Sequence, residues 1–114
     1  TKQDIGTKSC GCIFKNVPWP KSEAHQKRLL FLLPELAGYK YRSTIPVSFL
    51  IDHGVGLKGK KIGGVHISRK HANYFINDGN ARAEEVVMLI GLVKEYIHRK
   101  FDVHLEEEVQ YIGM

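Results

Sequence analysis

A helical pattern of apolar residues between positions 80 and 100 constrains the fold more than any other feature of this chain. Apolar side chains recur there at spacings of three and four residues, as on the buried face of an amphipathic helix. Glutamates lie in the first turn and basic residues in the last, which suits the helix dipole. The pattern therefore predicts a long helix, capped by Asn80, that packs against a second layer. Its buried face is expected to contain Val86, Leu89, Ile90, Val93 and Ile97.

Shorter elements are predicted before this helix. Ser22 can cap a helix that ends at Pro34, and Pro46 can begin another that ends at Gly54. Residues 37–44 are expected to form a loop.

The strand pattern sets the fold class. Strands are expected over residues 12–16, 59–67, 72–76 and 101–112, the second of them bulged by close-set glycines. The order of the elements predicts an α+β fold, in which helices pack on a small mixed sheet. The length of the chain suits a single domain over residues 1–114.

Composition and charge argue against several classes of protein. No apolar run approaches the roughly 20 residues of a membrane helix, so we expect no membrane partner. The formal charge is +5, but the basic residues are scattered, which argues against nucleic acid. Cys10 and Cys12 lie too close for an unstrained disulfide, and reduced thiols fit a cytoplasmic protein. The chain begins at Thr1 rather than Met, so we expect it to be a piece of a longer protein.

Two segments at opposite ends of the chain carry the chemistry. Cys12 supplies a thiol that can donate a proton, with Lys15 and Asn16 close behind it, and residues 106–108 are three consecutive glutamates. Simpler readings stay open, because a cysteine can be a small buried hydrophobe and an acidic run can protect a sheet edge. If folding brings the segments together, one reacting carbon can meet both a donor and a stabilising charge.

The histidines and glycines predict no metal site and no bound cofactor. His71 follows Arg69 and Lys70, so this segment can hold a phosphate or carboxylate, although a solvated basic loop is the commoner meaning. None of the six histidines shows HExxH or a comparable ligand spacing. The glycine pairs lack the strand, spacing and helix of a dinucleotide-binding fingerprint.

Five motifs together resemble one enzyme family. They are Gly11-Cys12-Ile13-Phe14-Lys15-Asn16; Leu50-Ile51-Asp52 with Gly56-Leu57-Lys58-Gly59; Ile62-Gly63-Gly64; Ser68 to Asn73 with Asn77 and Gly79-Asn80-Ala81; and Leu105 to Val109 with Ile112-Gly113. In order and content these are similar to motifs of the UDP-N-acetylenolpyruvoylglucosamine reductases, flavoenzymes of bacterial cell-wall synthesis. The resemblance places the chain at the C-terminal, substrate-binding domain of that family.

The resemblance implies a function and a role for each site residue. The full-length enzymes use FAD and NADPH to reduce the enolpyruvyl group of a UDP-sugar, and the domains that bind most of the flavin are absent from this chain. Cys12 is expected to donate the proton and Glu108 to stabilise the enolic intermediate. Lys15, Asn16 and His71 are expected to bind substrate. The isolated chain is expected to be inactive.

The sequence also departs from the family pattern. Cys12 stands where the family usually has serine, and Val17 where it usually has proline. The span 18–44 is longer than expected between the motifs, so we expect an inserted helix and loop there. An alternative function stays open, in which the chain is a non-catalytic module that binds sugar nucleotides or other anions.

Overall fold

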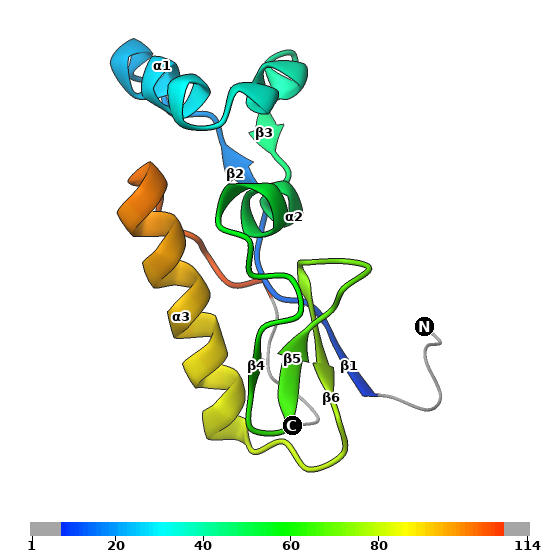
Figure 1. The fold of residues 1–114 in the computed structure, drawn as a ribbon. Helices are drawn as coiled ribbons and strands as arrows, with labels where there is room; N and C mark the ends of the chain where they lie inside the picture. The colour runs from blue at the N-terminus through cyan, green and yellow to red at the C-terminus, as the bar shows by residue number, and fades with distance from the viewer. Residues whose placement is uncertain (1–7, 109–114) are drawn as a thin grey trace.

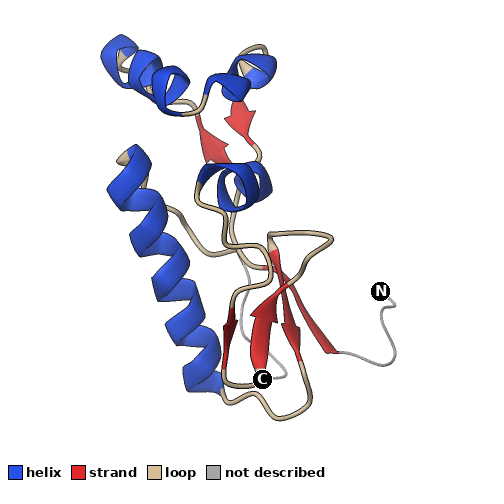
Figure 2. Cartoon of the chain, viewed as in Figure 1, coloured by secondary structure: helices blue, strands red, loops and turns tan. Residues whose placement is uncertain are grey.

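The computed structural model describes residues 8–108, which form an antiparallel sheet with helices packed against it. Figure 1 shows the arrangement, and Figure 2 the same view coloured by secondary structure. The elements in chain order are β1 (Lys8–Cys12), β2 (Val17–Pro18), α1 (Glu23–Leu32), the 3₁₀ helix η1 (Pro34–Tyr39), β3 (Thr44–Ile45), α2 (Val47–Phe49), the π-helical turn η2 (Leu50–Gly54), β4 (Lys61–Ile62), β5 (Val65–Ile67), β6 (Tyr74–Asn77) and α3 (Ala83–Phe101).

The main sheet confirms the α+β class but corrects the expected strand directions. Its order is β1-β6-β5-β4, and every pairing in it is antiparallel, so the sheet is not mixed. The expected bulged strand over 59–67 is instead the hairpin β4–β5. Gly63 turns it with a φ of 56°, which glycine adopts without strain. A Cβ on Gly64 would lie 2.7 Å from the backbone nitrogen of Ala81, so the hairpin approaches the start of α3 too closely for a side chain.

The long helix α3 is confirmed, and its apolar face forms the centre of the core. It buries the predicted set of side chains and also Phe101, its last residue. The helix starts later than expected, with Arg82 rather than Asn80 at the N-cap. The carboxylate of Glu85 accepts the backbone N–H groups of Arg82 and Gly64, at 3.0 and 3.1 Å. This one side chain therefore closes the helix terminus and ties it to the β4–β5 hairpin.

The expected last strand over residues 101–112 was largely wrong. Phe101 belongs to α3, Asp102 ends it in the left-handed conformation, and residues 103–108 contain a single isolated bridge, from Glu107 to Phe14. Residues 109–112 lie outside the described part of the chain. Val103 and Leu105 are buried. Their alternation with polar residues therefore reflects a segment buried on one side, although this segment forms no ladder of paired strand residues.

The span 18–44 folds as a compact addition at one end of the molecule. The predicted helix after Ser22 is confirmed, and the Ser22 side chain accepts the backbone N–H of His25. The expected loop over 37–44 begins inside η1. Strands β2 and β3 pair in antiparallel fashion, so both ends of the span lie side by side. Between residues 8 and 108, no helix is long and apolar enough to cross a bilayer.

Candidate functional site

The two chemistry-bearing segments meet in the structure, although they lie almost a chain length apart in sequence. The backbone N–H of Glu108 donates to the carbonyl of Ile13 at 2.8 Å, and that of Lys15 donates to Glu106 at 2.9 Å. Phe14 and Glu107 form the bridge between these two bonds. Residues 13–15, which follow Cys12 directly, and residues 106–108 therefore run side by side.

Asn73 holds the thiol-bearing segment from its other edge. Its Oδ1 accepts the N–H of Phe14 and its Nδ2 donates to the carbonyl of Phe14, both at 3.0 Å. The Asn73 carbonyl also accepts the N–H of Ile13. The side chain is buried and replaces a strand pair at this point. In the sequence Asn73 stands out only as the end of a family motif, and its burial and hydrogen bonds identify the clamp.

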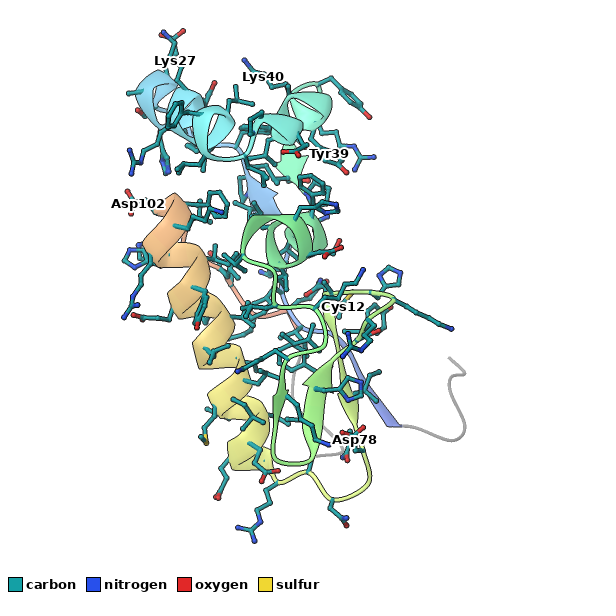
Figure 3. The ribbon with its side chains drawn as sticks, viewed as in Figure 1. Cys12, Lys27, Tyr39, Lys40, Asp78 and Asp102 are labelled. Carbon is teal, nitrogen blue, oxygen red and sulfur yellow. The ribbon has the colours of Figure 1, made fainter. Side chains whose placement is uncertain are left out.

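Cys12 lies at the end of β1, paired in register with Tyr74 of β6, and its side chain is exposed (Figure 3). The charge of a Cys12 thiolate raises the pKa of the Tyr74 hydroxyl, and a hydrogen bond between the two groups and partial burial raise it further. The thiol therefore has a hydroxyl neighbour that stays protonated in the neutral range. Sequence reasoning did not identify Tyr74, because the β1–β6 register is a long-range pairing.

The three consecutive glutamates differ in their partners. Glu106 forms an ion pair with Lys15 at 3.7 Å, and Glu107 forms one with Lys94 of α3 at 2.9 Å. Glu108 is exposed and has no ion pair within residues 8–108. Two of the three glutamates are thus paired with lysines, and Glu108 is the one without a lysine partner among the described residues.

Lys15 and Asn16 line a hollow of ≈ 120 Å³ on the surface, together with His104 and Glu106. The Oδ1 of Asn16 accepts the backbone N–H of Val47 at 3.0 Å and so caps the start of α2. The amide NH₂ of Asn16 is the part of this side chain that can bind a ligand.

His71 lines a different hollow, of ≈ 200 Å³, beneath α2 and η2. Lys58 and Lys70 line it too, but Lys58 is held by Asp52 at 3.2 Å. The structure therefore does not gather the three expected substrate-binding residues in one hollow. Neither of these two hollows is lined by Cys12 or Glu108, whose side chains are exposed on the surface instead.

The N-termini of α1 and α3 do not suit the phosphates of a flavin dinucleotide. A flavin dinucleotide needs backbone N–H groups for its phosphates, as an open helix N-terminus would provide. At α3 the Glu85 carboxylate accepts the N–H of Arg82, the N-cap residue, and at α1 the Ser22 hydroxyl accepts the N–H of His25, with Glu23 in the first turn. Both termini carry a negative group where a phosphate would have to bind.

Fold and site together define a small α+β domain that sets the segment after its first strand beside the acidic segment that follows its long helix. Comparison with known families gives the class a name. The chain belongs to the family of the UDP-N-acetylenolpyruvoylglucosamine reductase C-terminal domain, whose family model matches residues 3–112.

Curated relatives agree with the family match. A UDP-N-acetylenolpyruvoylglucosamine reductase of Syntrophomonas wolfei is 49% identical over 80 residues, which cover 68% of this chain and 26% of that protein. One of Syntrophobacter fumaroxidans is 36% identical over 111 residues, 97% of this chain and 25% of that protein. One of Halalkalibacterium halodurans is 36% identical over 105 residues, 92% of this chain and 26% of that protein. The chain spans about a quarter of the length of these relatives.

Proposed function

We propose that this chain is the substrate-binding and proton-donating domain of an oxidoreductase that reduces UDP-N-acetylglucosamine enolpyruvate to UDP-N-acetylmuramate for peptidoglycan synthesis. The family match and the named relatives support the reaction. The observation that supports the assignment to particular residues is the pairing of residues 13–15, directly after Cys12, with residues 106–108.

In this proposal the Cys12 S–H donates a proton to the substrate carbon and leaves a thiolate. An exposed thiol at a strand end is accessible to a substrate, and the Tyr74 hydroxyl beside it can donate a hydrogen bond to the thiolate that forms. Glu108 stabilises the enolic intermediate from the other segment. Its lack of a lysine partner within the described residues favours it over Glu106 and Glu107.

Substrate binding is assigned to Lys15, Asn16 and His71. Lys15 and the Asn16 amide are donors at one hollow, and His71 lies with Lys70 at the second, so an extended anionic substrate can contact both. Ring contact with Tyr74, at 5.1 Å between centroids, orients His71 beside the residue that pairs with Cys12.

The cofactors belong to the rest of the protein. FAD and NADPH are bound by flavin-binding domains that are partners of this one, and no step of the reduction itself is assigned to these residues. The complete enzyme works in the cytoplasm, and the isolated chain is inactive because it holds the donor without the reductant.

The test replaces the matching C-terminal segment of the Syntrophomonas wolfei reductase with this chain and measures NADPH oxidation driven by the enolpyruvyl UDP-sugar. Cys12→Ala should lower kcat by about 10²- to 10⁴-fold, the usual worth of a positioned general acid. Cys12→Ser should retain part of the rate, because a hydroxyl can still donate. Glu108→Gln should lower kcat with little change in KM.

The matched control is Glu107→Gln. It removes a carboxylate from the same acidic run, but one already paired with Lys94, so turnover should stay near that of the parent chimera. If Cys12→Ala and Glu108→Gln both turn over like the parent, the assigned chemistry is wrong.

A second candidate function is anion binding without catalysis. The hollow lined by Lys58, Lys70 and His71 favours it, because Lys70 has no ion-pair partner within residues 8–108. Calorimetry on the isolated chain separates the two. A standalone module should bind the UDP-sugar unaided, whereas a dependent domain should bind it weakly or not at all.

A further inference from the structure

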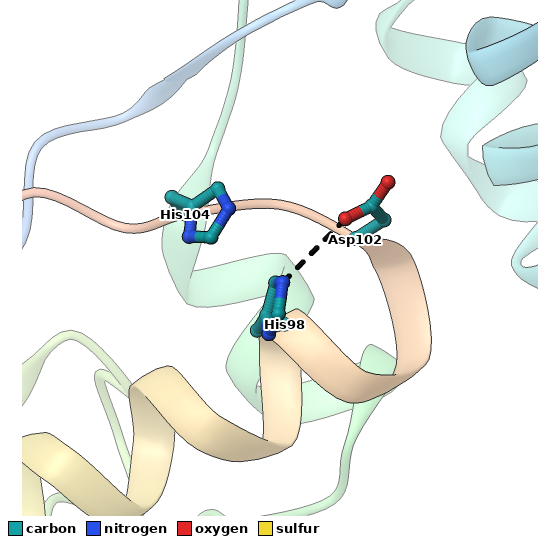
Figure 4. Close-up of side chains that lie close together, drawn as sticks. All are labelled: His98, Asp102 and His104. Carbon is teal, nitrogen blue, oxygen red and sulfur yellow. Dashed lines mark ion pairs between the residues drawn. The ribbon is translucent and has the colours of Figure 1, made fainter.

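The C-terminal end of α3 gathers two histidines and an aspartate (Figure 4). His98 lies in the last turn, Asp102 is the residue that ends the helix, and His104 follows two residues later. Each offers one ligand atom, and these atoms all lie within 4.8 Å of one another. The His98 Nε2 is 3.5 Å from an Asp102 carboxylate oxygen, and the two imidazole rings are 4.3 Å apart between centroids.

The backbone conformation of residues 98–104 explains how the three side chains come together. Asp102 is one helical turn beyond His98, so the two side chains share a face. Asp102 is the one non-glycine residue with positive φ in the described part of the chain, at φ 56° and ψ 44°, and its N–H bonds the His98 carbonyl at 2.9 Å. This left-handed residue reverses the chain and brings His104 back beside the last turn.

We propose that His98, Asp102 and His104 form a binding site for a divalent transition-metal ion of the zinc class. Two imidazole nitrogens and one carboxylate oxygen are a ligand set that zinc accepts, with a fourth position left to water. Ligands at about 2.1 Å in a tetrahedron lie about 3.4 Å apart. The His98–Asp102 separation already matches, and the exposed side chains can rotate to close the remaining pairs.

Local electrostatics suit a cation here. The free carbonyls of a helix C-terminus carry partial negative charge. Nearby basic side chains have other partners: Arg99 pairs with Glu95 at 2.9 Å, and Lys100 donates to the Gly54 carbonyl at 2.6 Å. Lys15, which lines a hollow with His104, pairs with Glu106 at 3.7 Å, and His25 bonds the Phe101 carbonyl at 2.9 Å.

The ion would act as a tether. It would fix the start of the 102–108 segment to α3, and that segment leads to the pairing with residues 13–15. From the sequence no metal was predicted, because the histidines show no known ligand spacing. Spacing is a poor guide here, because the left-handed turn at Asp102 brings together residues that no standard motif would place together. His104 also lines the hollow of Lys15 and Asn16, but the proposal does not depend on the assignment of Cys12 and Glu108.

The test is calorimetric titration of the full 114-residue chain with ZnCl₂, together with the visible spectrum of the chain loaded with CoCl₂. We expect one zinc ion per chain and a cobalt spectrum typical of tetrahedral or five-coordinate nitrogen and oxygen ligands. His98→Gln, His104→Gln and Asp102→Asn should each weaken zinc binding at least ~10-fold. Asparagine also accepts the left-handed conformation, so Asp102→Asn tests the charge without changing the turn.

His53→Gln is the matched control. His53 is an exposed histidine 3.7 Å from Asp52, in a pair that belongs to no cluster of three ligand atoms among the described residues, and its loss should leave zinc affinity unchanged. Circular dichroism checks that each variant is folded. Unchanged affinity in His98→Gln or His104→Gln overturns the proposal, and so does a thiolate-to-cobalt charge-transfer band in the wild-type spectrum, which would place the ion on cysteine.

Discussion

At the scale of single residues, the site depends on a side chain that performs no chemistry. Asn73 satisfies both the N–H and the C=O of Phe14 inside the protein, as a neighbouring strand would. Phe14 is buried two residues after Cys12, and it bridges Glu107 of the segment that bears Glu108. The position of the thiol therefore depends on an amide that can accept and donate at once, which no other short side chain except glutamine provides.

Asn73→Asp should destabilise the chain by about 2–4 kcal/mol, because the Phe14 carbonyl loses its donor and a carboxylate is buried beside it. Urea denaturation at neutral pH measures the change. Asn80→Asp is the control, since Asn80 is exposed, and its effect should stay within about 0.5 kcal/mol. Equal stability of the two variants would mean that the clamp is dispensable.

At the scale of elements, a single carboxylate links α3 to the β4–β5 hairpin. Glu85 accepts the backbone N–H of Arg82 at the helix N-cap and that of Gly64 in the hairpin turn. These two hydrogen bonds, the Arg82 bond first, lower the pKa of Glu85. The neighbouring glycines complete the junction, because Gly63 and Gly64 leave the space that the carboxylate and the Ala81 backbone occupy.

This junction should weaken in acid. A carboxyl whose pKa is lowered by folding contributes stability above its unfolded value of 4.5, and that contribution is lost as pH falls through the lower folded value. Urea midpoints measured from pH 6 down to pH 2.5 should fall less steeply for Glu85→Gln than for the wild type. Glu84→Gln removes a charge from the same turn without touching the hairpin, and it should follow the wild-type curve. A Glu85→Gln curve parallel to the wild-type curve would refute the assignment.

At the scale of the whole molecule, the 18–44 span shares one core with the sheet and α3. Leu29 and Leu36 belong to the same buried cluster as the apolar face of α3. His25 of α1 bonds the Phe101 carbonyl at the end of α3, at 2.9 Å. The indole N–H of Trp19 donates to Tyr39 and closes the span on itself.

We therefore expect a single cooperative unfolding transition. Trp19 is the only tryptophan, so its fluorescence reports on the unfolding of the 18–44 span. The far-ultraviolet circular dichroism signal is dominated by α3. Their urea midpoints should coincide. Leu29→Ala should lower both together, by about 2–5 kcal/mol, while Phe31→Ala, at an 81% exposed position, should change neither. A Trp19 transition at lower urea than the helix transition would show that the span is a separate unit.

Elements whose sequence signal comes from residues close together in the chain could be predicted from the sequence alone. Elements that form by pairing with residues far away in the chain could not. The periodicity of α3 and the Ser22 cap depend on neighbours three or four residues away, and both were predicted. The strand expected from Phe101 was wrong because an alternating pattern also fits an extended segment buried on one side. The β4–β5 hairpin was missed because Gly63-Gly64 fits either a bulge or a turn.

The amino-acid order by itself determined the family, the α+β class and which thiol and acidic run were candidates for chemistry. Tertiary structure alone decided which glutamate lacks a lysine partner among the described residues, which amide clamps Phe14, and which histidines stand together. The physical reason is the range of the forces involved. Helix caps and periodicity act within one turn of chain, whereas ion pairs and buried hydrogen bonds join whichever groups the folded backbone makes neighbours.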